Sequence, residues 1–353
     1  MLELLNTKIF DNERNILNAD LFVNNLKHTF KAFKFNTKIT YEVYRNITIY
    51  HITWNDDKSY EDMLELKKEI ALALGVTTNE FEIEKEKENE VKIKVQNMKK
   101  STLSLKELLE ESKDKDNNNI PLGLSEEDKV IYFNIEKDKN LLVTGVTGIG
   151  KTNLFNNIIL NILMNKDKTK IIILDSQSIN YNAYDKLCEV VNNEQEIINK
   201  IKEIRHIFEE KVKNNDQSRI ILFIDEIYEI IKNDISVKDD INYLLEVGAT
   251  MNIHIIMSTD SVLDEDINYL FDKDDISKLS FYLTTRREYN KFLDNYIDES
   301  LGRNGIYVST NSTLTRISLP LIEDDEITRV VDNLKVIVVR SIYEEERKGK
   351  RSG

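Results

Sequence analysis

The segment of residues 145–152 concentrates the residue types that bind phosphate. It reads Gly-Val-Thr-Gly-Ile-Gly-Lys-Thr and holds three of the ten glycines in the 353-residue chain. Glycines let successive backbone N–H groups converge on phosphate oxygens, because they adopt unusual backbone angles and leave no side chain in the way. In such a loop Lys151 reaches the β- and γ-phosphates of ATP, and the Thr152 hydroxyl completes the coordination of Mg²⁺. We therefore predict that ATP and Mg²⁺ bind here, with the nucleotide held by Gly145, Val146, Thr147, Gly148, Ile149, Gly150, Lys151 and Thr152.

Two adjacent carboxylates, Asp225 and Glu226, follow the apolar run of residues 220–224. A buried strand would carry both acids to its carboxyl end, where open α/β sheets bind ligands. Asp225 would then hold Mg²⁺, and Glu226 would orient and deprotonate the water that attacks the γ-phosphate. A buried strand that merely meets a solvated turn explains the two acids equally well when they are taken alone. Paired with the glycine-rich loop, they predict a catalytic set of Lys151, Asp225 and Glu226 and metal ligands Thr152 and Asp225.

The loop needs a strand before it and a helix after it. Residues 141–144 are apolar and short, and residues 153–164 carry an apolar face at helical spacing. Further along, short β-rich runs alternate with helical patterns, which is typical of a mostly parallel sheet with helices on both faces. The expected strands cover residues 140–144, 170–175, 219–225, 253–259, 279–283 and 305–309.

The first third of the chain has a different organisation. Its periodicity predicts helices near residues 18–35, 59–74 and 103–111, and strands within residues 37–54 and 81–95. Residues 113–119 are polar and contain no apolar residue, which is typical of a linker. We therefore expect a small α+β domain over residues 1–112, a linker over 113–120, a P-loop ATPase domain over 121–340 and a basic tail over 341–353.

Composition limits the function classes. With 41% apolar residues the chain can bury a sizeable core, so a disordered protein is not expected. The net charge of −14 argues against a surface that is basic all round, so any DNA contact has to be local. Cys188 is the single cysteine, which excludes an intramolecular disulfide and fits a reducing cytoplasm. No segment reaches the roughly 18 apolar residues of a membrane span.

Several motifs, in order, resemble the FtsK/SpoIIIE family of DNA-pumping motors. Residues 141–152 are similar to a strand followed by the family's Gly-Thr-Thr-Gly-Ser-Gly-Lys-Ser loop, and residues 174–184 stand where the family has Ile-Asp-Pro-Lys and then a tyrosine. Residues 224–230 are similar to the family's Asp-Glu-Leu-Ala-Asp-Leu segment. Residues 252–259 read Asn-Ile-His-Ile-Ile-Met-Ser-Thr, where the family has Gly-Ile-His-Leu-Ile-Leu-Ala-Thr. The match spans roughly residues 121–334.

The resemblance implies a RecA-like P-loop NTPase fold preceded by a reduced α+β domain. It also implies ATP hydrolysis coupled to translocation of double-stranded DNA by a homo-oligomer, a hexameric ring in the family. Because the family's membrane-spanning part and its winged-helix DNA reader have no counterpart here, we expect a role in plasmid or mobile-element DNA transfer or maintenance.

The chain also departs from the family pattern. The family's Thr-Gln-Arg-Pro after the sensor strand is Thr-Asp-Ser-Val at residues 259–262, and its Gly-Arg-Ala-Ala is Gly-Ala-Thr-Met at residues 248–251. The γ-phosphate sensor and the arginine supplied between subunits therefore lack their usual residues. The substitutes that the sequence offers are Arg286, Arg287 and Arg303, each of which ordinary surface charge explains as well.

Two further functions stay open. A secretion-type ATPase of the same superfamily would act on protein substrates and dock on a membrane partner, and the acidic balance favours it slightly. A nucleotide-dependent scaffold without hydrolysis would fit the missing sensor residues. Two other residues have a structural explanation: His254, between isoleucines, is expected to be a hydrogen-bonded core residue, whereas Asp175 fits a structural and a functional role equally.

Overall fold

The computed structural model describes residues 1–6, 13–98, 101–112, 116–165, 169–177, 180–271, 273, 276–293, 304–310 and 313–349. The chain forms two compact units. The smaller unit comprises Lys8–Thr102 and Glu126–Lys129, and the larger comprises Met1–Thr7, Leu103–Ser125 and Val130–Gly353.

The units do not divide at the expected linker. The helix α4 (Leu105–Glu111) belongs to the larger unit, because Leu105 and Leu109 pack into the same core as Ile120 and Leu122. Residues 113–115 lie outside the described residues, and the strand β5 already begins at Asn119. At the other end, the backbone of α10 (Asp324–Gly349) runs through residue 341, so the expected tail continues a helix. The polar composition of residues 113–119 indicated a loop, but it could not show on which side of the loop α4 packs.

The smaller unit is the predicted α+β domain. Its four strands form an antiparallel sheet in the order β1-β2-β4-β3, and α1 covers it with Ala19, Val23, Leu26 and Phe30 at helical spacing. Gly75 ends α3 in the left-handed conformation, with φ 66°. The elements are α1 (Glu13–Ala32), β1 (Thr37–Val43), β2 (Ile47–Trp54), α2 (Tyr60–Glu65), α3 (Lys67–Leu74), β3 (Phe81–Lys87) and β4 (Glu90–Gln96).

The larger unit is built on a ten-stranded sheet in the order β6-β5-β14-β13-β12-β7-β11-β10-β8-β9. The strands from β12 to β9 are parallel, and those from β12 to β6 pair antiparallel. The mostly parallel α/β fold is therefore confirmed. Its strands are β5 (Asn119–Ser125), β6 (Val130–Asn134), β7 (Asn140–Thr144), β8 (Lys170–Asp175), β9 (Glu189–Val191), β10 (Ile220–Asp225), β11 (Ile253–Thr259), β12 (Ile276–Ser280), β13 (Asn304–Val308) and β14 (Leu314–Ser318).

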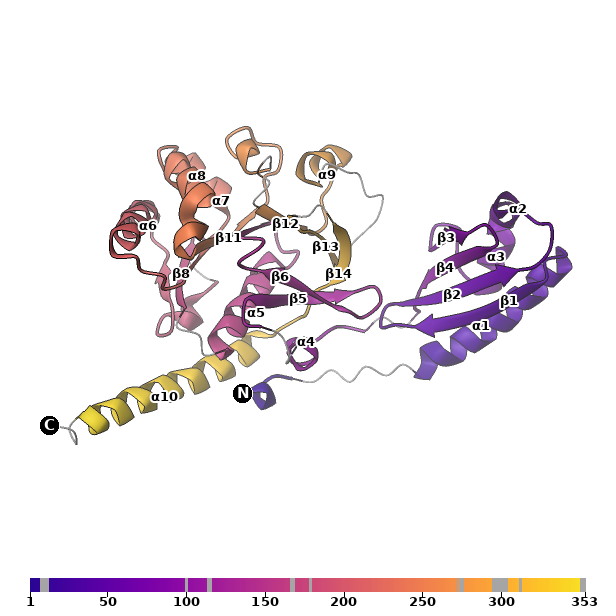
Figure 1. Ribbon diagram of the computed structural model, residues 1–353, viewed down its shortest axis with the longest axis horizontal. Coiled ribbons are helices and arrows are strands. Elements are labelled where there is room, and N and C mark those ends of the chain that lie inside the picture. Colours follow the sequence, from indigo (N-terminus) through magenta and orange to yellow (C-terminus); the bar gives the residue numbers. More distant parts are fainter. Residues whose placement is uncertain are drawn as a thin grey trace. The chain divides into compact units, whose positions relative to one another are not determined.

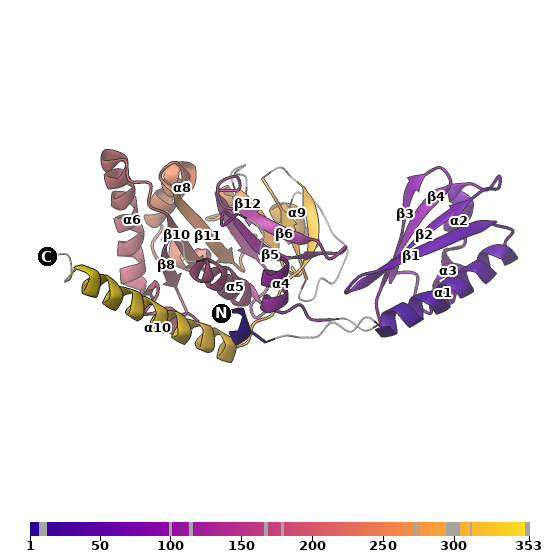
Figure 2. The ribbon, with the colours of Figure 1, turned by 60° about the horizontal axis from the view of Figure 1, so that its bottom comes forward.

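Helices cover both faces of this sheet, as Figures 1 and 2 show. One face carries α4, α5 (Lys151–Met164) and α10, and α5 and α10 lie against each other. The other face carries α6 (Glu194–Asn214), α7 (Ile227–Asn233), α8 (Val237–Val247) and α9 (Arg286–Leu293). Two apolar cores result, and the sheet separates them. Among the described residues, no helix combines the length and apolar character needed to cross a bilayer.

Candidate nucleotide-binding site

The glycine-rich loop connects β7 to α5, in the strand–loop–helix context that the sequence predicts. Gly145, Gly148 and Gly150 have φ values of 151°, 79° and 125°, which favour glycine. A Cβ at Gly145 would lie 2.6 Å from the Cβ of Phe281, so the loop also needs glycine for space. Because α5 begins at Lys151, its first-turn N–H groups lack intrahelical acceptors and point at the loop. The backbone thus forms a cradle for an anion.

Lys151 is buried beneath this loop and holds two partners. Its Nζ donates to the Gly145 carbonyl oxygen at 2.7 Å and forms an ion pair with Glu226 Oε1 at 3.0 Å. The side chains of Lys151 and Glu226 are only 5% and 7% exposed. Two residues separated by seventy-five positions therefore meet, because β11 places the carboxyl end of β10 near that of β7.

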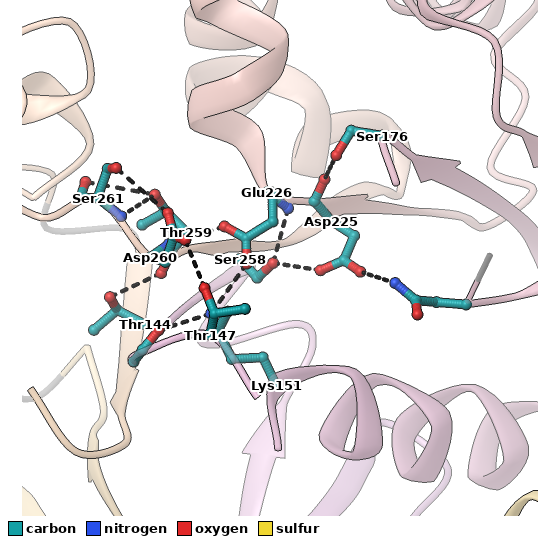
Figure 3. Close-up of polar contacts among 12 residues, drawn as sticks. Thr144, Thr147, Lys151, Ser176, Asp225, Glu226, Ser258, Thr259, Asp260 and Ser261 are labelled. Carbon is teal, nitrogen blue, oxygen red and sulfur yellow. Dashed lines mark hydrogen bonds and ion pairs between the residues drawn. The ribbon is translucent and has the colours of Figure 1, made fainter. Parts of the chain in front are cut away.

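The Asp225 carboxylate is fixed by hydrogen bonds to both of its oxygens. Ser258 Oγ, on β11, donates to Oδ1 at 2.6 Å, and the Tyr181 hydroxyl donates to Oδ2 at 3.1 Å. Burial raises the pKa of Asp225 above its usual range, although these two hydrogen bonds and the nearby Lys151 oppose the shift. Figure 3 shows the carboxylate between Ser258 and the loop that carries Ser176.

Glu226 leaves the strand in a left-handed conformation, with φ 56°, which turns its side chain away from that of Asp225. Its backbone N–H donates to Ser258 Oγ at 2.9 Å, and its Oε2 accepts from the Asp260 N–H at 2.9 Å. Burial is also the main cause of its raised pKa, which Lys151 lowers and the charge of Asp260 raises. The two acids thus point to different partners, as the catalytic interpretation requires.

Asp260 links the P-loop to the Glu226 carboxylate. Its Oδ2 accepts from Thr147 Oγ1 at 2.9 Å, while its backbone N–H bonds Glu226 (Figure 3). The sequence marked residue 260 only as the place where the family has an amide side chain. In the structure this single aspartate hydrogen-bonds both to Thr147 of the loop and to Glu226.

The loop after β8 contributes contacts that the sequence did not reveal. Ser176 Oγ donates to the Asp225 carbonyl oxygen at 3.0 Å, and Asn180 Nδ2 lies 3.4 Å from Asp225 Oδ2. The Asp175 carboxylate accepts the backbone N–H groups of Gln177 and Asn180, at 3.2 and 2.9 Å. These bonds favour the structural interpretation of Asp175, which fastens a loop that reaches Asp225.

Comparison with known proteins agrees with this geometry. The FtsK/SpoIIIE family profile matches residues 104–298, more than half of the chain. The chain belongs to the FtsK/SpoIIIE family. It is 25% identical over 92% of its length to the DNA translocase FtsK of Streptococcus pyogenes serotype M3, and 23% identical over 91% to the DNA translocase SpoIIIE of Bacillus subtilis. These alignments cover 45% and 46% of the two relatives, so the chain spans about half their length.

Solved structures share the fold at low sequence identity. The conjugation coupling protein TcpA of pCW3, in its monomer form with ATPγS, matches 88% of this chain and 99% of its own, with a TM-score of 0.60 and 12% identity. The cytoplasmic domain of the type VII secretion ATPase EccC of Thermomonospora curvata matches 66% of this chain and 34% of its own, with a TM-score of 0.56 and 13% identity. The RecA-like P-loop ATPase fold of this FtsK/SpoIIIE-family chain is therefore confirmed.

Of the remaining residues singled out in the sequence, His254, Arg286 and Arg287 lie within the described residues. His254 is buried, and its Nδ1 lies 2.9 Å from the Lys139 carbonyl oxygen. Burial lowers its pKa to about 4, so it is neutral near pH 7. Arg286 and Arg287 are exposed at the first turn of α9, and Arg303 lies outside the described residues. The segment where the family has Gly-Arg-Ala-Ala forms the short helix η3 (Gly248–Met251) before β11, at the opposite end of that strand from Ser258.

The donor set fits a magnesium ion. Thr152 offers a hydroxyl and Asp225 a carboxylate, which are oxygen donors of the kind that Mg²⁺ binds beside nucleotide phosphates. The Tyr181 hydroxyl donates to Asp225 Oδ2 at 3.1 Å, and Thr152 opposes the rise that burial causes in the pKa of the same phenol. Both donors therefore lie near one group.

Proposed function

We propose that this chain hydrolyses ATP in the presence of Mg²⁺ and uses the reaction to move double-stranded DNA. The observation that carries the proposal is the meeting of Lys151 and Glu226 at 3.0 Å, directly beneath a loop whose three glycines have positive φ. If the glycine-rich turn only connected a strand to a helix, a lysine and a carboxylate would not be expected to lie buried under it, because both charges lose their hydration there.

The residues divide the work as follows. The backbone of residues 145–152 binds the triphosphate, and Lys151 exchanges its bond with Glu226 for the β- and γ-phosphates. Glu226, released from Lys151, orients and deprotonates the attacking water, while its bond to the Asp260 N–H keeps it in place. Thr152 and Asp225 would hold Mg²⁺, which supplies positive charge to the phosphate oxygens as the reaction proceeds.

DNA as the substrate is supported by the relatives, which are named DNA translocases and match nine-tenths of this chain. We further propose that the chain works as a homo-oligomer, a hexameric ring, in which a neighbouring copy supplies an arginine. Within the described residues Lys151 is the cation that contacts Glu226, and the side chains of Arg286 and Arg287 are exposed at the start of α9. Transfer or maintenance of a plasmid or other mobile element is the process we propose, since TcpA, whose fold the chain shares, is a conjugation coupling protein.

The first experiment measures ATP turnover by the full chain with and without double-stranded DNA. We expect DNA to increase turnover, and the increase to fall steeply as salt rises, because phosphate contacts release counterions. Lys151→Ala should abolish turnover in both conditions. Turnover that DNA does not change would contradict the DNA part of the proposal, and turnover that survives Lys151→Ala would contradict the ATPase site itself.

A secretion-type ATPase is the second candidate, favoured by the net charge of −14. An acidic chain repels nucleic acid except where cations cluster, whereas it imposes no such limit on a protein substrate. The same assay separates the two functions. ATP turnover that double-stranded DNA does not change, but that requires Lys151 and Glu226, would favour the secretion-type function.

A further inference from the structure

Tyr181 is a buried tyrosine that has no role in the mechanism proposed above. The residue is 0% exposed and immediately precedes the short helix η2 (Asn182–Tyr184). Its hydroxyl donates to Asp225 Oδ2 at 3.1 Å. It therefore bonds directly to one of the two residues that would hold Mg²⁺.

The loop that carries Tyr181 is fastened at several points. Asp175, at the end of β8, accepts the backbone N–H groups of Gln177 and Asn180. Ser176 Oγ bonds the Asp225 carbonyl oxygen at 3.0 Å, so the loop contacts the backbone of the same residue whose side chain Tyr181 bonds. The position of the phenol relative to Asp225 is thus set by backbone bonds and does not depend on side-chain packing alone.

A buried tyrosine usually finds some hydrogen-bond partner, and the neighbouring Tyr184 illustrates this ordinary case. Tyr184 is also 0% exposed, and its hydroxyl donates to Asn156 Oδ1 at 3.1 Å, on α5. Tyr181 differs because its acceptor is a carboxylate whose other oxygen already accepts from Ser258 at 2.6 Å. With one hydroxyl on each oxygen, the carboxylate cannot rotate about its Cβ–Cγ bond without losing a charge-assisted hydrogen bond.

We propose that Tyr181 is a positioning residue, which holds the Asp225 carboxylate in one orientation and thereby sets how tightly the nucleotide complex binds Mg²⁺. The proposal rests on the ATP site proposed above and adds to it a residue outside the P-loop and the acidic strand end. Residues that orient a metal ligand by a hydrogen bond change metal affinity when they are removed, because the ligand then has to be ordered by the metal itself.

The experiment compares the full-length wild type with Tyr181→Phe and Tyr184→Phe. Binding of a fluorescent, non-hydrolysable ATP analogue is measured while Mg²⁺ is titrated, and again in EDTA. Tyr181→Phe should require about 10-fold more Mg²⁺ for half-maximal enhancement of binding. Its affinity for the nucleotide in EDTA should stay within about twofold of wild type, because the P-loop is untouched. Tyr184→Phe, which removes an equally buried hydroxyl, should match the wild type in both conditions.

Each alternative outcome has a distinct meaning. An unchanged Mg²⁺ requirement in Tyr181→Phe, or an equal shift in Tyr184→Phe, would overturn the proposal. A lower requirement would overturn it too, since the phenol would then compete with the metal. If Tyr181→Phe does not fold, Ser258→Ala tests the other carboxylate oxygen and should shift the Mg²⁺ requirement in the same direction. A wild type that binds no nucleotide at all would instead refute the proposed function.

Discussion

In the proposed function, the Lys151–Glu226 pair is a contact that nucleotide binding has to break. Both side chains are nearly fully buried and 3.0 Å apart, so each is the other's main source of charge compensation. Removing one partner of a buried pair costs about 3–5 kcal/mol, because the other charge is left uncompensated. A γ-phosphate offers Lys151 a new partner of the right sign, which frees Glu226 for the attacking water. Binding and the release of the base are thereby one exchange of partners.

Glu226→Gln separates the two halves of this exchange. We expect the variant to bind ATP at least as tightly as the wild type, because the nucleotide no longer has to break the ion pair with Lys151. It should hydrolyse ATP at least about 100-fold more slowly, because an amide cannot accept the proton of the attacking water. The measurements are nucleotide binding by fluorescence and phosphate release. Glu229→Gln, an exchange of the same type on α7, serves as the control and should leave both unchanged. Unaltered hydrolysis in Glu226→Gln would contradict the role of Glu226 as the base, whereas a wild type that binds ATP without hydrolysing it would favour the scaffold function.

The pH dependence of hydrolysis follows from the burial of Glu226. Its pKa is raised above the ordinary 4.5, mainly by burial and further by the charge of Asp260. As the pH falls through a raised pKa, the carboxyl is protonated and stops acting as a base, so kcat/KM, which reports the nucleotide-free enzyme, should decline at a pH above the usual glutamate range. Asp260→Asn removes the charge but keeps an acceptor for Thr147, so the decline should move to lower pH. A kcat/KM profile that is identical in the two proteins would contradict this assignment.

Sequence alone could predict the P-loop residues and the two acids, because their chemistry requires fixed residue types at fixed spacing. It could not predict Tyr181 or Ser258, since a tyrosine or serine takes a role at Asp225 only through the sheet order that brings β8, β10 and β11 together. Ser258 did leave a signal: the family pattern has alanine at that position. This difference from the family did not show that the serine hydroxyl donates to Asp225 Oδ1.

At the scale of elements, the parallel strands and the strand β13 were predicted, but the antiparallel pairing of β13 and the strands β5, β6 and β14 were not. Residues 119–125 form β5 although they include Pro121 and Gly123, which normally argue against a strand. The Pro121–Gly123 region coincides with a register shift against β6, which accommodates both residues. The expected strand at residues 279–283 lies three residues earlier, at Ile276–Ser280, where β12 pairs with β7. The position of a strand depends on the strands with which it pairs, and local periodicity carries no information about those partners.

Gly123→Ala tests why a glycine occupies β5. A Cβ there would overlap the backbone carbonyl oxygen of Ser318, so β5 and β14 could not pair at their present distance. We expect a loss of about 1–3 kcal/mol in the free energy of unfolding of the larger unit, measured by urea denaturation. Gly305→Ala is the control, because its Cβ would meet only the ends of Leu279 and Leu319 at 3.3 and 3.4 Å, beside the Ser280 carbonyl oxygen at 3.4 Å. Equal effects of the two substitutions would contradict the role given to the Ser318 oxygen.

At the scale of the whole molecule, the chain does not fold as two consecutive blocks. Met1–Thr7 belongs to the larger unit, and the smaller unit begins after it. Leu5 is buried in the core that contains α5 and α10, the Asn6 N–H donates to Glu326 Oε1 at 2.6 Å, and Arg329 Nε donates to the Leu4 carbonyl oxygen at 3.3 Å. The charged residues 323–326 at the start of α10 did not indicate a contact with residues more than three hundred positions away. The domain boundaries were therefore the least predictable feature of the fold.

Leu5→Ala tests to which unit the first residues belong. Leu5 is 3% exposed, and truncation of a buried leucine costs about 2–5 kcal/mol, so one unfolding transition should weaken clearly. The transition of the larger unit can be identified without any probe inside it, because Mg²⁺ and an ATP analogue stabilise only the unit that binds them. We expect Leu5→Ala to lower the nucleotide-sensitive transition and to leave the other unchanged. Leu72→Ala, at a leucine of the smaller unit that is 82% exposed, should alter neither. If Leu5→Ala weakened the nucleotide-insensitive transition instead, the first residues would belong to the smaller unit. The ATPase unit would then begin near Leu103.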